Sequence, residues 1–187
     1  MLLLASASPR RVELLRAAGY EFEVVPADVD EAALATPDPW RTAEATALAK
    51  ARAVLAIRPW ATVIGGDTVV ALETEFGWKL LGKPQDDADA TRMLRLLNRR
   101  EHVVVTGVAV VTARREHVAS ETSRVRLRMT EDEIAAYVAS GEPRGKAGAY
   151  AIQSDHPGIA LVDGPWDNVV GLPIKVVKRL LDPSKMI

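Results

Sequence analysis

The chain has 187 residues, with 24 Lys plus Arg against 25 Asp plus Glu and a formal net charge of -1. Apolar residues make up 48% and charged residues 26%, a balance that argues against a disordered, collagen-like or repetitive fibrous chain. The near-neutral charge gives no support for a protein that coats a nucleic-acid polymer or an anionic membrane, and the lack of cysteine removes disulfides, thiolate metal sites and cysteine nucleophiles.

Short β-branched runs alternate with helical patterns along the chain, and no linker or low-complexity tract divides it. The patterns predict strands at 2–5, 22–26, 62–64, 69–72, 79–81, 102–112, 117–127, 149–152 and 159–162. They predict helices at 9–18, 40–57, 87–97, 131–139 and 173–181. We therefore expect one α/β domain over residues 1–187.

The runs 102–112 and 117–127 are typical of a long antiparallel hairpin. A hairpin beside strand-helix alternation predicts a mixed β-sheet flanked by helices. The apolar stretch at 2–5 is too short for a signal peptide or a membrane span, and the absence of cysteine permits a cytoplasmic location. We expect a cytoplasmic protein with no membrane partner.

Helix boundaries carry recognisable signals. Ser8 is suited to cap the first helix before Pro9, and Gly19 to end it. Thr130 and Glu133 have the spacing of a capping box at the start of the fourth helix. These signals support the predicted helix boundaries.

The first candidate site is the segment Ser6-Ala7-Ser8-Pro9-Arg10-Arg11, between a strand and a capped helix. Unpaired amides at a helix start, two hydroxyls and two guanidiniums together suit phosphate oxygens. The alternative, with about equal weight on physical grounds, is that Ser8 only caps the helix and both arginines face solvent. The segment alone does not decide between them.

The second candidate is Gly65-Gly66-Asp67-Thr68, after the strand predicted at 62–64. Glycines at a strand end allow a tight turn or a close ligand, and Asp67 would then project into a cleft, where it could hold a metal or accept a proton. Taken alone, an ordinary turn is the stronger interpretation.

Acidic and basic residues supply the remaining candidates. Asp28, Asp30 and Glu31 gather in one loop, and one or two carboxylates plus substrate phosphates would suffice for Mg²⁺. Single members of such a loop are usually solvated. Lys83 and Lys146 lie in glycine-bearing connections, where backbone can form a pocket wall.

The sequence argues against two other familiar sites. The segment 141–147 is one residue short of a phosphate-binding P-loop, ends in Ala and follows a helical pattern. His102, His117 and His156 lack zinc-ligand spacing, so we interpret them as strand or loop residues.

Several segments, in order and over nearly the whole chain, resemble the Maf-type nucleoside triphosphate pyrophosphatases. They are Leu4 to Arg11, Val29-Asp30-Glu31, Gly66-Asp67-Thr68, Gly82-Lys83-Pro84, Gly141-Glu142-Pro143, Lys146 to Gln153 and Asn168 to Pro173. The resemblance implies a mixed α/β sheet with two lobes around a deep cleft, a Maf/ITPase-like fold, usually in a homodimer. It implies hydrolysis of a nucleoside triphosphate between its α and β phosphates, with a divalent cation such as Mg²⁺, Mn²⁺ or Co²⁺.

The resemblance also implies roles for individual residues. Asp67 corresponds to the proton acceptor, and Glu31 with Asp67 to the metal ligands. The phosphate ligands it implies are Ser8, Arg11, Arg52, Lys83 and Lys146. The family commonly has Lys where Arg52 aligns, and Lys50 lies two residues earlier, so either could supply that charge.

Three positions bear on the base. Arg10, Thr68 and Gln153 are similar to the dTTP/UTP pyrophosphatase branch, whereas the 7-methylguanosine branch carries an aromatic residue, Gln and Glu there. The Gln153 amide can both donate to and accept from a pyrimidine edge, while an ionised Glu only accepts. Thr106-Gly107 is closer to the other branch, and Gly145 and Ser154 depart from the family pattern.

We therefore expect a pyrophosphatase that hydrolyses dTTP and UTP, with modified pyrimidine nucleotides as further substrates. Two alternatives stay open. One is a pyrophosphatase acting on 7-methyl-GTP or another modified nucleotide. The other is a non-enzymatic, nucleotide-binding regulator of septum formation, which the family's history brings into consideration.

Overall fold

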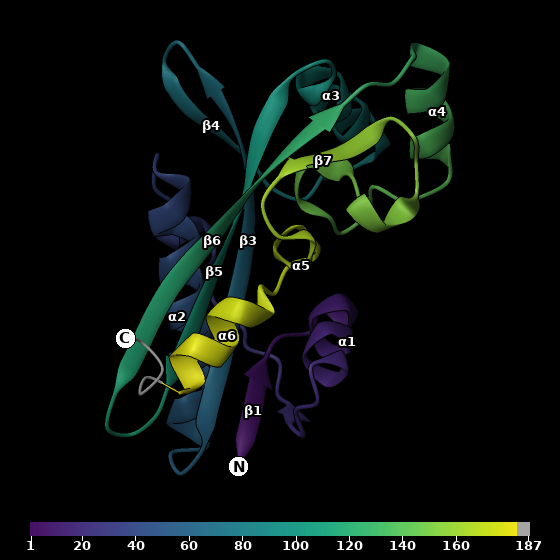
Figure 1. Ribbon diagram of the computed structural model, residues 1–187. Helices are drawn as coiled ribbons and strands as arrows, with labels where there is room; N and C mark the ends of the chain where they lie inside the picture. Colours follow the sequence, from purple (N-terminus) through teal and green to yellow (C-terminus); the bar gives the residue numbers. More distant parts are fainter. Residues whose placement is uncertain (183–187) are drawn as a thin grey trace.

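The computed structural model describes residues 1–182 and contains one seven-stranded sheet with helices on both faces (Figure 1). Its strands are β1 Leu2–Ala5, β2 Glu23–Val24, β3 Thr62–Thr74, β4 Gly77–Leu81, β5 Glu101–Val111, β6 Glu116–Leu127 and β7 Ile159–Asp163. Its α-helices are α1 Pro9–Ala17, α2 Pro39–Ile57, α3 Asp87–Leu97, α4 Glu131–Ala139, α5 Trp166–Val170 and α6 Ile174–Leu181, and 3-10 turns lie at Ala32–Leu34, Ala147–Ala149 and Ile152–Ser154.

The strand order is β2-β1-β3-β5-β6-β7, and β4 pairs with the far end of β3. Strand β1 runs parallel to β2 and β3, whereas the other pairings are antiparallel. The long hairpin of β5 and β6 crosses the molecule (Figure 1). The predicted mixed sheet flanked by helices is thus confirmed.

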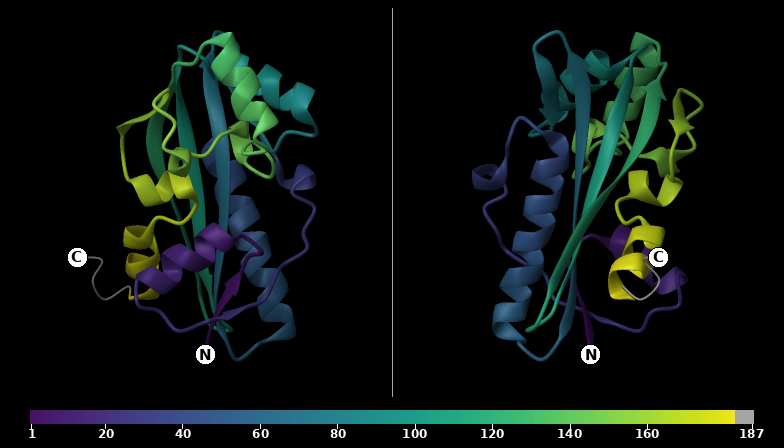
Figure 2. Two further views of the ribbon diagram at one scale, coloured as in Figure 1. Left: turned by 90° about the vertical axis from the view of Figure 1, so that its right-hand side faces the viewer. Right: turned by 60° about the vertical axis from the view of Figure 1, so that its left-hand side comes forward.

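The two faces of the sheet bury different helices. Val63 and Ala109 pack under α2, whereas Ile64 and Val108, one position along each strand, pack under α1 and α6. Figure 2 shows α2 on one side of the sheet and α1 with α6 on the other. This alternation follows from the two-residue period of a strand.

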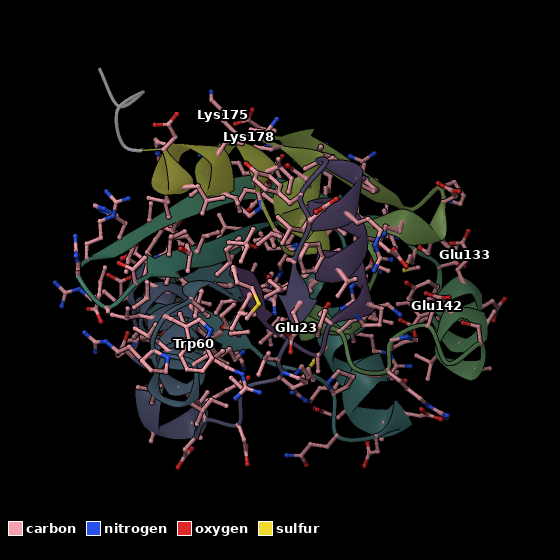
Figure 3. The ribbon with its side chains drawn as sticks, turned by 90° about the horizontal axis from the view of Figure 1, so that it is seen from below. Glu23, Trp60, Glu133, Glu142, Lys175 and Lys178 are labelled. Atoms are coloured by element: carbon pink, nitrogen blue, oxygen red, sulfur yellow. The ribbon has the colours of Figure 1, made fainter. Side chains whose placement is uncertain are left out.

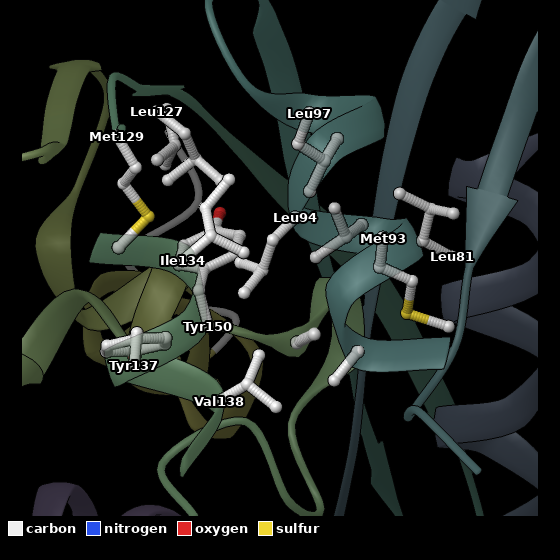
Figure 4. Close-up of a cluster of buried hydrophobic side chains, with 14 of the residues drawn as sticks. Leu81, Met93, Leu94, Leu97, Leu127, Met129, Ile134, Tyr137, Val138 and Tyr150 are labelled. Carbon is white, nitrogen blue, oxygen red and sulfur yellow. The ribbon is translucent and has the colours of Figure 1, made fainter. Parts of the chain in front are cut away.

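A third hydrophobic group lies at the end of the sheet near β4. Leu94 of α3, Ile134 of α4 and Tyr150 converge there, as Figure 4 shows. This group anchors the segment after α4 against the sheet. The capping box predicted at Thr130 and Glu133 is present at the start of α4.

Helix α6 is amphipathic. Val176, Val177 and Leu180 are buried, while Lys175 and Lys178 point away from the sheet (Figure 3).

Within residues 1–182, helices long and apolar enough to cross a membrane are absent.

The turn predicted at Gly65-Gly66-Asp67-Thr68 is wrong, because these residues continue the single long strand β3. The absence of a side chain at Gly65 is explained by the packing of α2 on the sheet. A Cβ at Gly65 would lie 2.1 Å from the carbonyl oxygen of Ala47, and one at Gly107 on β5 would lie 2.3 Å from that of Ala43. Two glycines on adjacent strands therefore let α2 lie directly on the sheet.

Two further differences concern the C-terminal third. The strand predicted at 149–152 is instead the pair of 3-10 turns around Tyr150, where Gly148 and Ala149 both have positive φ. The short helix α5 was not predicted, since five residues are too few for a periodic pattern.

Candidate functional site

The candidate site lies at an open stretch of the edge of β3. Strand β1 pairs with β3 as far as Gly65, and β4 pairs with the same edge from Val70 onward. Strand β5 occupies the opposite edge along this whole stretch. Between Gly65 and Val70, the described chain places no strand on the first edge, and a pocket of about 920 Å³ opens there.

Polar residues from six parts of the chain line this pocket. Predicted site residues among them are Ser8, Arg10, Arg11, Glu31, Asp67, Thr68, Lys83, Lys146 and Gln153. Lys50, the alternative to Arg52 as the source of positive charge, lines it too, together with Thr42 and Thr46. Segments up to 145 residues apart in sequence thus meet at one opening.

One ammonium group joins the two predicted metal ligands. Lys50 Nζ lies 2.8 Å from Asp67 Oδ1 and 2.7 Å from Glu31 Oε1. The side chains of Lys50 and Asp67 are largely buried, whereas that of Glu31 is about half exposed, at 48%. The close packing of α2 on Gly65 and Gly107 places Lys50 beside Asp67, two residues along the strand.

The charges at this cluster reinforce ionisation of Glu31. Partial burial opposes ionisation, but the hydrogen bond and charge of Lys50, with the charges of Lys83 and Arg11, hold the pKa of Glu31 below its usual value. Glu31 therefore stays a carboxylate around neutral pH. The Glu31 carboxylate can therefore bind a cation or accept a hydrogen bond.

The structure separates Arg52 from this cluster. Its guanidinium donates to both carboxylate oxygens of Glu116 on β6, at 2.8 and 2.6 Å, on an exposed surface. Two residues along an α-helix turn the side chain by about 200°, so Lys50 and Arg52 face different directions. Arg52 is not among the described residues that line the pocket.

The N-terminal segment places Arg11 at the same edge of β3 but on the opposite face of the sheet from Lys50. Arg11 Nε donates to the Gly171 carbonyl at 2.8 Å, Nη2 to Thr68 Oγ1 at 3.1 Å and Nη1 to Ser6 Oγ at 3.3 Å. Burial lowers the pKa of Arg11, while the charge of Asp67 raises it. The guanidinium is thus fixed and faces the pocket.

Ser8 occupies the N-cap position of α1, as predicted, but its hydroxyl makes no capping hydrogen bond. Its backbone amide instead donates to Ser6 Oγ at 3.2 Å. The Ser8 hydroxyl is therefore available to the pocket, as a phosphate ligand requires.

The far wall is the segment that carries Lys146 and Gln153. Lys146 Nζ donates to the carbonyl oxygen of Glu142 and lies 3.3 Å from its carboxylate. Lys83 approaches from the end of β4, where the Gly148 amide donates to the Gly82 carbonyl at 3.1 Å. A main-chain hydrogen bond thereby links the two lysine-bearing segments.

Two aromatic hydroxyls hold this segment in place. Tyr150 Oη lies 2.8 Å from His102 Nε2, and the Ala151 amide donates to Tyr137 Oη at 3.0 Å. Burial lowers the pKa of His102 to about 4, so the imidazole is neutral at physiological pH. The lining residues on either side of Tyr150 are thus tied to the core.

The donor set fits a divalent cation that is shared with substrate. The carboxylates of Glu31 and Asp67 both contact Lys50 Nζ and therefore lie close together, and one or two carboxylates are what Mg²⁺ takes from proteins at phosphate sites. Among residues 1–182, groups of three or more metal-ligating side chains are absent, so phosphate oxygens or water would complete the shell. Asp30 instead accepts from the Ala33 amide at 3.1 Å, and neither it nor Asp28 lines the pocket.

Sequence reasoning missed several residues here. Thr42 and Thr46 precede the candidate Lys50 at four-residue spacing and form one polar stripe of α2 with it, a pattern that the predicted helix makes visible in the sequence. Glu142 and Thr106 lie in segments that the resemblance includes, but no local pattern predicts which side chains they contact. The structure pairs Glu142 with Lys146 and Thr106 with Thr68.

Comparisons with known proteins agree with this arrangement. The family model described as Maf-like protein matches residues 1–184. A dTTP/UTP pyrophosphatase of Moorella thermoacetica is 48% identical over 184 residues, covering 96% of this chain and 93% of that protein. One from Koribacter versatilis is 46% identical over 182 residues, with 96% and 92% covered.

A dTTP/UTP pyrophosphatase of Thermococcus gammatolerans is 42% identical over 183 residues, with 96% of this chain and 95% of that protein covered. Among solved structures, the Ham1 protein of Staphylococcus aureus gives a TM-score of 0.48 at 18% identity, over 67% of this chain and 71% of that one. The family match spans both walls of the pocket and the sheet between them, and the chain belongs to the Maf family.

Proposed function

We propose that this protein hydrolyses dTTP and UTP between the α and β phosphates, releasing the nucleoside monophosphate and pyrophosphate. The observation that carries the proposal is that the paired carboxylates of Glu31 and Asp67 share one pocket with Arg11, Lys83 and Lys146. A triphosphate carries about four negative charges, so a divalent ion and several fixed cations suit it. The names of the similar proteins agree with this substrate class.

In this mechanism Asp67 orients the attacking water and takes its proton. Lys50 occupies Oδ1 of Asp67, which leaves Oδ2 to face the water. Arg11, Lys83 and Lys146 neutralise the phosphates that leave as pyrophosphate, and Ser8 adds a hydroxyl. Glu31 and Asp67 would hold the divalent cation, Mg²⁺, Mn²⁺ or Co²⁺, which supplies Lewis-acid polarisation of the phosphate.

Gln153 is proposed to recognise the base, since its amide offers a donor and an acceptor to a pyrimidine edge. Arg10 and Thr68 are the other proposed specificity positions, and all three line the pocket. The homodimer and the cytoplasmic location expected from the sequence remain predictions.

The test is a panel of dTTP, UTP, CTP, GTP and 7-methyl-GTP with each of the three metals, with the products identified. We expect pyrophosphate from dTTP and UTP. Asp67→Asn should lower kcat by roughly 10² to 10⁴, the range for loss of a general base. Asp28→Asn, a nearby acid outside the pocket lining, is the matched control and should keep normal turnover.

Three results would overturn the proposal in different ways. Orthophosphate as product would reject the proposed bond. Preference for 7-methyl-GTP would move the enzyme to the other branch. Tight nucleotide binding without turnover under every metal would favour the regulator.

A further inference from the structure

The guanidinium of Arg11 is held by three partners from three elements. Gly171 and Thr68 accept two of its N–H groups and Ser6 a third, out of the five that a guanidinium carries. Two donors are therefore left for a ligand. Their direction depends on the partners that fix the group.

One of those partners begins a hydrogen-bond chain that leads away from the pocket. Thr68 Oγ1 lies 3.0 Å from Thr106 Oγ1, which lies 2.8 Å from the carbonyl oxygen of Asn168. A carbonyl only accepts, so the single proton of Thr106 must point to Asn168. The Thr68 hydroxyl then donates to Thr106, and its lone pair accepts from Arg11.

The far end of this chain is firmly held. Asn168 is fully buried, and its Nδ2 donates to the Val104 carbonyl at 3.0 Å and to Ser123 Oγ at 2.9 Å. Ser123 Oγ in turn donates to the Pro165 carbonyl at 2.8 Å. Thr106 is also fully buried, so water cannot readily replace a lost partner.

We propose that Thr106 and Asn168 are positioning residues that orient the Arg11 guanidinium toward phosphate oxygens. Neither residue is among the described ones that line the pocket, so both act through Thr68. The segment from Asn168 to Gly171 thereby supplies two carbonyls to Arg11, one directly and one through two hydroxyls. The inference rests on the proposed function, in which Arg11 binds the leaving phosphates.

The hydrogen bonds from Arg11 through Thr68 and Thr106 to the Asn168 carbonyl all point the same way, and near-isosteric changes can interrupt them. Hydrogen bonds that point the same way polarise one another in a buried setting, so removing the middle hydroxyl weakens the bond at Arg11 as well. Thr106→Val removes that hydroxyl at similar volume. Thr106→Ser keeps it and serves as the rescue variant.

We expect Thr106→Val to raise the KM for dTTP and the Kd for pyrophosphate about tenfold, as loss of one hydrogen bond predicts, with kcat within about threefold of wild type. Thr106→Ser should stay within about threefold in all three quantities. A purely structural role would lower the active fraction, and hence kcat, without changing KM or Kd. Thr62→Val is the matched control and should change none of the three quantities, because Thr62 lies on the same face of β3 as Thr68 but at the far end of the strand.

A double-mutant cycle separates action through Arg11 from a general effect on the pocket. In an Arg11→Lys background, Thr106→Val should cause no further rise in the Kd for pyrophosphate. An equal rise in both backgrounds would overturn the proposal. If thermal unfolding shows that Thr106→Val does not fold, Ser123→Ala removes the hydroxyl that holds the Asn168 side chain at the end of the chain. The Kd for pyrophosphate should then rise about threefold, and no rise is the contrary result.

Pyrophosphate binding, measured by calorimetry on the full chain, keeps the inference distinct from the proposed function. If the wild type hydrolyses dTTP but Thr106→Val keeps its KM and Kd, the inference fails and the function stands. If the wild type has no turnover yet binds pyrophosphate, and Thr106→Val weakens binding tenfold, the function fails and the inference stands. Binding of neither nucleotide nor pyrophosphate by the wild type overturns both.

Discussion

Asp67 and Thr68 are consecutive residues of β3, and their side chains serve opposite faces of the sheet. Asp67 meets Lys50 on the α2 face at 2.8 Å, whereas Thr68 meets Arg11 on the α1 face at 3.1 Å. The pocket reaches both because it lies at the open edge of the strand. One dipeptide thus connects the carboxylate side of the site with its phosphate-binding side.

Lys50, not Arg52, should be the helix cation that activity requires. Lys50→Met leaves two carboxylates facing each other without their shared ammonium, so kcat/KM should fall by roughly 10² or more. Arg52→Met breaks only an exposed pair with Glu116 and should stay within about threefold. Steady-state kinetics on both variants would reveal the contrast, and equal losses would contradict the assignment.

Close packing of α2 should make Gly65 sensitive to the smallest added side chain. Gly65→Ala places a Cβ 2.1 Å from a backbone oxygen, so we expect a loss of about 3 kcal/mol or more in the free energy of unfolding. Gly82→Ala, with nothing within 4 Å of its Cβ, should change it by no more than about 0.5 kcal/mol. Urea unfolding measures both, and similar small effects would mean that α2 can shift away.

His102 should make stability depend on pH. Its pKa is about 4 in the folded protein, below the ordinary 6.5, because burial disfavours the charged ring. The unfolded chain therefore takes up the proton first as pH falls, and the stabilisation present above pH 6.5 is progressively lost toward pH 4. The slope is about 1.4 kcal/mol per pH unit, or about 3 kcal/mol over the interval.

His102→Gln removes this titration while keeping a group able to hydrogen-bond Tyr150. Urea unfolding at several pH values should show a steeper acid loss for the wild type than for the variant. Parallel pH curves would indicate that His102 titrates normally in the folded state.

Gln153→Glu should change which base is preferred, because an ionised carboxylate accepts hydrogen bonds but does not donate them. We expect kcat/KM for dTTP and UTP to fall by about tenfold, from loss of one donor, with a smaller loss for a cationic methylated base. Gln85→Glu, outside the pocket lining, is the control. An unchanged ranking of bases would exclude Gln153 from base recognition.

Much of the architecture could be predicted from local patterns. The bounds of α3, α4 and β1 agree with the prediction, and those of the long hairpin agree to within a residue. Hydrophobic periodicity and capping depend on residues that are close together in sequence, so the sequence alone predicts them. The capping box at Thr130 is one such local signal. The segments that line the pocket were also identified by residue type and by resemblance.

Other features were decided by the tertiary structure. Gly65 was read as a turn because the reason for its missing side chain is the carbonyl of Ala47, which reaches it only when α2 packs on the sheet. The choice between Lys50 and Arg52 depends on which face of α2 meets Asp67. Sequence determined which chemical groups are present and in which elements, while contacts between distant segments determined which of them meet, because side-chain partners across a fold leave no local pattern.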